Sequence, residues 1–103
     1  MAIQFHPHAT EEVAEAAAWY ASRSARASGE FIARVYAATS LIHDLPLASP
    51  LWPGVEDFEI RKRVVRGYPF LIAYVIRREH VVVLAVAHAK RRPFYWLART
   101  KDL

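Results

Sequence analysis

The residues best suited to chemistry in this chain are basic and aromatic, and they gather in its second half. Eleven of the fourteen lysines and arginines lie between Arg61 and Lys101. Residues 59–103 carry eleven basic and three acidic side chains, a net charge of +8, whereas residues 1–58 carry three basic and seven acidic, a net of −4. Cationic side chains attract phosphates and carboxylates, so we expect a nucleic acid, an enzyme that acts on nucleic acid or an acidic protein segment as the partner. The candidate binding residues are Arg61, Arg63, Arg77, Arg91, Arg92, Tyr95 and Trp96.

The elements that must position these residues follow from the hydrophobic pattern. Apolar and charged residues alternate over 58–65, which predicts a strand with Arg61 and Arg63 on one face and Val64 on the other. Residues 69–77 and 80–88 are apolar on both parities, which predicts central strands with both faces covered. The short polar run between them is typical of a hairpin connection. We expect 94–101 to form a short helix or a tail that covers part of the sheet.

The first half of the chain predicts a short strand and two helices. Residues 3–5 indicate the strand, and an alanine-rich helix follows Pro7 up to residue 21. We expect 22–29 to separate it from a second helix that ends before Pro46. The second helix carries an apolar stripe at helical spacing, widened by Leu41 and Leu45. That stripe consists of Phe31, Val35, Ala38 and Ile42.

Together these elements predict an α+β fold in one domain, residues 1–103. An N-terminal short strand and a helical hairpin would pack on a mainly antiparallel β-sheet. The proline-rich loop 46–57 is not expected to divide two domains, because neither half has enough apolar residues for its own core. On the uncovered face we expect a basic concave surface lined by Arg61, Arg63 and Arg77.

Composition excludes several classes of protein. The absence of cysteine excludes disulfides and thiolate metal sites and suits a reducing compartment, so we expect a cytoplasmic protein. No apolar run is long enough for a membrane span, and no secretory signal is expected at the N-terminus. His6 and His8 lack a third ligand at a recognisable spacing, so we predict no metal and no cofactor.

Two sequence phrases resemble the RelE/ParE superfamily of toxins from type II toxin–antitoxin modules. The first runs from Arg63 to Tyr74 and contains an aromatic-Pro-aromatic corner at Tyr68-Pro69-Phe70. The second runs from Leu84 through Pro93 and Trp96 to Arg99 and is similar to the ending of ParE-like members. The resemblance covers nearly the whole chain. It implies a growth-inhibiting toxin that a cognate antitoxin neutralises, in an oligomer with that antitoxin.

The resemblance leaves the target open between DNA gyrase, which ParE-like members are associated with, and mRNA on the ribosome, which RelE-like members cut. RNA cleavage needs a base, an acid and cations around the phosphate. The ribonuclease candidates here are Arg61, Arg63, Arg77, His88, Arg92 and Tyr95. Arginine is a poor proton donor or acceptor, because its pKa exceeds ~12. We therefore expect a ParE-like toxin that acts by binding, with a RelE-like mRNA interferase or a non-toxic antitoxin-binding module as the alternatives.

Three of these candidates also have purely structural interpretations. His88 ends an apolar strand, where a histidine more often forms a structural hydrogen bond than a catalytic one. Tyr95 and Trp96 are suited to stacking on bases, but also to covering the sheet.

Overall fold

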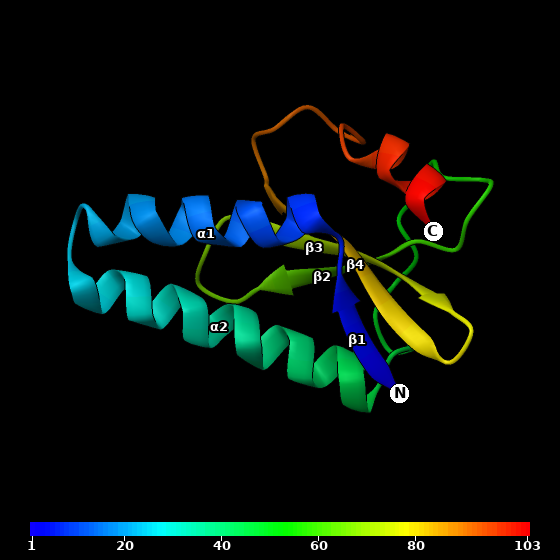
Figure 1. Ribbon diagram of the computed structural model, residues 1–103, viewed down its shortest axis with the longest axis horizontal. Coiled ribbons are helices and arrows are strands. Elements are labelled where there is room, and N and C mark those ends of the chain that lie inside the picture. Colours follow the sequence, from blue (N-terminus) through cyan, green and yellow to red (C-terminus); the bar gives the residue numbers. More distant parts are fainter.

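The computed structural model describes residues 1–103 and has the α+β fold expected from the sequence (Figure 1). A four-stranded sheet is covered on one face by a helical hairpin and on the other by the C-terminal segment. The elements are β1 Ala2–Phe5, α1 Pro7–Ala21, α2 Ala25–Asp44, β2 Arg61–Val65, β3 Phe70–Arg77, β4 His80–His88 and a 3₁₀ helix, Leu97–Asp102.

The two helices form the expected hairpin, but the break between them is shorter than predicted. Only Ser22–Ser24 separate them, because the Ser24 hydroxyl accepts a hydrogen bond from the Ala27 N–H over 2.9 Å and starts α2 there. Gly29 therefore lies inside α2. The four predicted stripe residues of α2 are all buried, and the helix ends before Pro46 as expected. Leu41 and Leu45 do not widen the stripe, since they are 44% and 59% exposed.

The strand order in the sheet is β1-β4-β3-β2, so β1 and β2 form its edges. The strands β2, β3 and β4 form the predicted antiparallel meander. β1 pairs parallel with β4 and places Phe5 opposite Val83. The β3–β4 connection is a two-residue turn in which Arg78 and Glu79 both adopt positive φ, at 48° and 68°. That conformation matches the twist of the strands, although it usually selects Asn or Gly.

Two hydrophobic cores lie on opposite faces of the sheet. The helix-side core contains thirteen buried residues, including Phe31 of α2, Ile72 and Tyr74 of β3, and Val83 of β4. The tail-side core consists of Ile60, Ala73, Val75, Leu84, Ala85, Ala87 and Trp96. β3 and β4 contribute to both cores, which explains why they are apolar on both parities. Neither helix combines the length and hydrophobicity needed to cross a bilayer.

Candidate functional site

The most connected polar group in the molecule is the Glu12 carboxylate, which α1 directs toward the C-terminal segment. Its side chain is only 10% exposed. Glu12 Oε1 accepts hydrogen bonds from Arg99 Nη1 over 2.9 Å and from the Val86 N–H over 3.1 Å. Glu12 Oε2 accepts from Arg99 Nη2 over 3.1 Å and from the Tyr95 hydroxyl. A buried carboxylate is thus fully paired by a guanidinium, a phenol and a backbone amide.

This cluster also completes the edge of β4 beyond the point where β1 ends. The last paired residue of β1 is Phe5, and the His6 N–H still reaches the Val83 carbonyl over 2.8 Å. Further along β4, Arg99 Nη1 donates to the Leu84 carbonyl over 2.9 Å, and Glu12 accepts from Val86. Glu12 and Arg99 therefore replace the missing strand partner.

The electrostatics of the cluster fix the protonation of Tyr95. Burial, the hydrogen bond to Glu12 and the charge of Glu12 together raise the pKa of the Tyr95 phenol far above its ordinary value. The guanidinium of Arg91 lies 3.8 Å from the centre of the Tyr95 ring and adds a cation–π contact. Burial opposes the charge of Arg99, but the hydrogen bond and charge of Glu12 outweigh it and raise the pKa of Arg99. Tyr95 is therefore a neutral hydrogen-bond donor that is held to Glu12.

The expected basic surface of three arginines does not form, because the arginines lie on different faces of the sheet. Residues directly opposite each other in a ladder share a face. Arg61 and Arg63 pair with Tyr74 and Ile72, which belong to the helix-side core. Arg77 pairs with His80 and follows Ile76, which packs against the helix-side core, so Arg77 projects from the tail side.

The face of β2 was misjudged because its apolar residues do not mark the helix side. Phe58 and Ile60, which precede β2, pack in the tail-side core, and Val64 is 57% exposed. Val65, of the same parity as Arg61, is the residue buried beneath the helices. Arg61 lies at the margin of that core, and its Nη1 donates to the Ser49 carbonyl over 2.8 Å. It thereby anchors the proline-rich loop.

The remaining predicted residues are dispersed. Trp96 is 1% exposed and fills the tail-side core, which agrees with the covering role considered for it and leaves little surface for a partner. The ring of His88 lies edge-on to Phe70, and its Nδ1 accepts a hydrogen bond from the Lys90 N–H over 3.1 Å. Arg92 is exposed and forms no ion pair. Among the predicted residues, Arg61 and Arg63 share one face of β2, and Arg91 contacts the ring of Tyr95.

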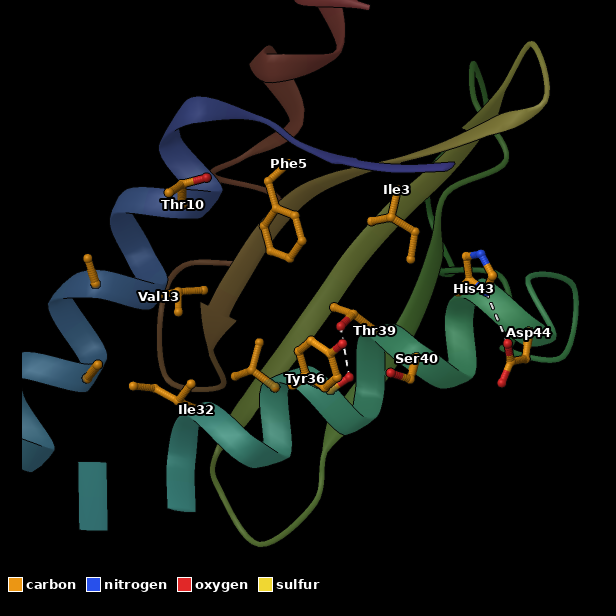
Figure 2. A pocket seen from close by; sticks show the side chains of 13 residues that line it. Ile3, Phe5, Thr10, Val13, Ile32, Tyr36, Thr39, Ser40, His43 and Asp44 are labelled. Carbon is orange, nitrogen blue, oxygen red and sulfur yellow. Dashed lines mark hydrogen bonds and ion pairs between the residues drawn. The ribbon is translucent and has the colours of Figure 1, made fainter. Parts of the chain in front are cut away.

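The structure has a large apolar groove on the helix side, whose lining residues were not predicted from the sequence. It has a volume of about 900 Å³ and lies between α1, α2 and the edge strand β1 (Figure 2). Ile3 and Phe5 project into it from β1, while Ile32 and Tyr36 project from α2. Ile32 is 48% exposed and Tyr36 is 73% exposed. We call this feature the hairpin groove.

Sequence reasoning missed Glu12 and the α2 residues of the groove. A glutamate near a helix N-terminus is usually explained by the helix macrodipole, but a carboxylate one turn into an apolar helix also fits a buried partner on another element. Ile32 and Tyr36 recur four residues apart, one position after the buried Phe31 and Val35. That second stripe was a readable signal for an additional apolar surface.

A short N-terminal strand, a helical hairpin and a mixed four-stranded sheet are the fold of RelE/ParE-type proteins. The chain matches the family model described as the ParE toxin of the type II toxin–antitoxin system parDE, over residues 3–93. Because the match covers most of the sequence, the chain belongs to the ParE toxin family. Tyr95, Trp96 and Arg99 follow the matched residues, so their roles depend on the geometry described above. A comparison with curated proteins finds no match.

Proposed function

We propose that this type II toxin inhibits growth by binding its cellular target, DNA gyrase, and not by cutting RNA. The observation that carries the proposal is the dispersal of the six ribonuclease candidates. Arg61, Arg63 and His88 lie on the helix side of the sheet. Arg77 lies on the tail side, and the Tyr95 hydroxyl is bound to Glu12. Acid–base cleavage requires groups that converge on one phosphate, and these do not.

The protonation of Tyr95 supports the same conclusion. In a RelE-like enzyme the resemblance gives a tyrosine a part in the cleavage. Here the phenol already donates to Glu12, and its raised pKa disfavours the phenolate. An RNA phosphate would have to displace a carboxylate that three other donors hold in place. Binding activity requires no such displacement.

The hairpin groove suits the antitoxin that membership of this family implies. Antitoxin segments that fold on binding gain affinity by burying apolar side chains in a groove. The hairpin groove exposes Ile32 and Tyr36 and runs beside β1, whose outer edge has no strand partner. We place the neutralising segment there, in a cytoplasmic toxin–antitoxin oligomer.

The test is inducible expression of the chain alone and together with the adjacent open reading frame. The proposal expects growth arrest that the neighbouring protein relieves, with intact transcripts and inhibition of purified gyrase supercoiling. Cuts inside ribosome-bound codons would show instead that the protein is an mRNA interferase. Tight antitoxin binding without growth arrest would identify a non-toxic binding module.

A further inference from the structure

A second cavity opens on the opposite side of the sheet from the hairpin groove. It has a volume of about 580 Å³, within the range of small-molecule sites. Its walls come from β1, the start of α1, the β3–β4 turn and the last residues of the chain. The polar side chains that matter here are Gln4, His6, His8, Arg77, Arg78 and His80, and we call the feature the arginine–histidine cavity.

The strand register explains why these groups converge. Arg77 and Ala2 both lie opposite His80, and Gln4 lies opposite Val82. Opposed residues share a face, so Gln4, Arg77 and His80 project from the tail side of three adjacent strands. Arg77 lies over the ring of Phe58, with its Cζ 5.9 Å from the ring centre, at the margin of the tail-side core. The convergence is therefore fixed by the sheet.

The two guanidinium groups of the cavity lack acidic partners. The arginines that form ion pairs elsewhere are Arg26, Arg91 and Arg99, and neither Arg77 nor Arg78 is among them. Asp102 is the one acidic side chain in the cavity wall. Its Oδ2 is already bound by His6 Nε2 over 2.7 Å.

We propose that the arginine–histidine cavity binds a phosphoryl group, carried by a nucleotide or by the end of a nucleic-acid strand. Planar guanidinium groups match the oxygens of phosphate, and the two that face this cavity are not paired with any carboxylate. The Gln4 amide and the His80 imidazole add further hydrogen-bonding groups. Metal binding is disfavoured, since no three histidine or acidic side chains are placed to hold one ion.

The histidine rings favour a nucleotide over a bare anion. The rings of His6 and His8 stack with centres 5.3 Å apart and planes inclined by 22°. His6 is buried, whereas the His8 side chain is 60% exposed, so the stack presents an imidazole face to solvent. Bases stack on such aromatic faces. The cavity therefore offers a cationic end for phosphate and a flat surface beside it.

The test follows the histidine resonances of the intact protein by NMR. Sodium phosphate, adenosine monophosphate and a 5′-phosphorylated single-stranded oligonucleotide would be titrated in turn, each against sodium chloride of equal ionic strength. The proposal expects saturable shifts at His8 and His80, with His43 of the hairpin groove unchanged. Tighter binding of the mononucleotide than of phosphate would identify a free nucleotide as the source, and tightest binding of the oligonucleotide would identify a strand end. Shifts equal to those in chloride would overturn the proposal.

Matched variants separate the cavity from general positive charge. Arg77→Gln and Arg78→Gln should each weaken phosphate binding at least tenfold, while Arg34→Gln, an exposed arginine of α2 without an ion pair, should leave it unchanged. Arg78 is exposed in a turn, so its replacement keeps the test valid even if Arg77→Gln reduces folding. Equal losses in all three variants would also overturn the proposal. Antitoxin binding at the hairpin groove is a separate measurement, so failure here leaves the proposed toxin function untouched.

Discussion

Arg99 donates two hydrogen bonds to Glu12, from Nη1 to Oε1 over 2.9 Å and from Nη2 to Oε2 over 3.1 Å, across 87 positions of the sequence. This bidentate pair ties the start of α1 to the C-terminal 3₁₀ helix. Both side chains are largely buried, at 10% and 14% exposure. The pair therefore helps to hold the C-terminal segment against the sheet, together with the buried Trp96.

Replacing Glu12 by Gln should destabilise the protein by about 3 kcal/mol. The amide nitrogen cannot accept a hydrogen bond, so donors from Arg99, Tyr95 or Val86 lose a partner in a buried site. Denaturant unfolding followed by circular dichroism measures the loss. Glu30→Gln is the control, because Glu30 forms an exposed pair with Arg26 and should cost less than about 0.5 kcal/mol. Equal losses for the two variants would contradict the structural role of Glu12.

Replacing Trp96 by Ala should cost about 3–5 kcal/mol, the range for deleting a large buried side chain. Trp96 is 1% exposed and contacts the ring of Trp52 at a centre distance of 5.0 Å. Trp19→Ala removes a side chain of the same size that is 54% exposed, and it should cost less than about 1 kcal/mol. Thermal unfolding of both variants checks the contrast. A Trp96→Ala protein as stable as Trp19→Ala would show that the tail does not close the core.

The spacing of apolar residues in the sequence correctly predicted the helix that buries one face and the strands that bury both. The stripe beginning at Phe31 and the two-sided apolar strands β3 and β4 lie where their patterns indicated. The sequence did not show which face of β2 turns toward the helices. Basic and apolar residues occur at both odd and even positions, and the adjacent Val64 and Val65 point to opposite faces. Only the packing of α2 over Val65 decides it.

Hydrogen bonds between residues far apart in the chain could not be predicted from the sequence, for a different reason. Glu12 finds Tyr95 and Arg99 only after β4 and the tail have folded back beside α1. Helical spacing places Glu12 on the same face as the buried Ala9 and Ala16, but spacing alone does not identify the partner of the carboxylate. The position of β1 was equally hidden, because a four-residue strand carries no pattern that selects a parallel partner.

Stability should fall in acid as the Asp102 carboxylate takes up a proton. The hydrogen bond from His6 lowers the pKa of Asp102 below its ordinary value. A lowered folded pKa gives stabilisation that is present above the unfolded pKa and is lost as the pH falls through the folded one. Carbon NMR of the side-chain carboxyl groups should show Asp102 titrating below an ordinary aspartate. In His6→Gln that difference should shrink, and an unchanged Asp102 titration would remove His6 as its cause.

Replacing Tyr95 by Phe should leave growth arrest intact while costing about 1 kcal/mol of stability for the lost hydrogen bond. The ring and its contact with Arg91 remain, and Glu12 is still held by Arg99. Growth curves after induction and thermal unfolding of the purified protein provide the two measurements. A stable Tyr95→Phe protein that no longer arrests growth would give the phenol a direct part in toxicity and would revive the ribonuclease alternative.

Replacing Tyr36 by Glu should separate neutralisation from toxicity. Tyr36 projects into the hairpin groove and is 73% exposed, so the charge should leave folding intact but oppose burial of an apolar antitoxin segment. We expect the affinity for the protein encoded next to the toxin to fall at least tenfold, about 1.4 kcal/mol. Ala37→Glu adds the same charge at the next position of α2, outside the groove, and should bind normally. Titration calorimetry measures the antitoxin affinity of both variants. Normal binding by Tyr36→Glu would show that the antitoxin binds another surface.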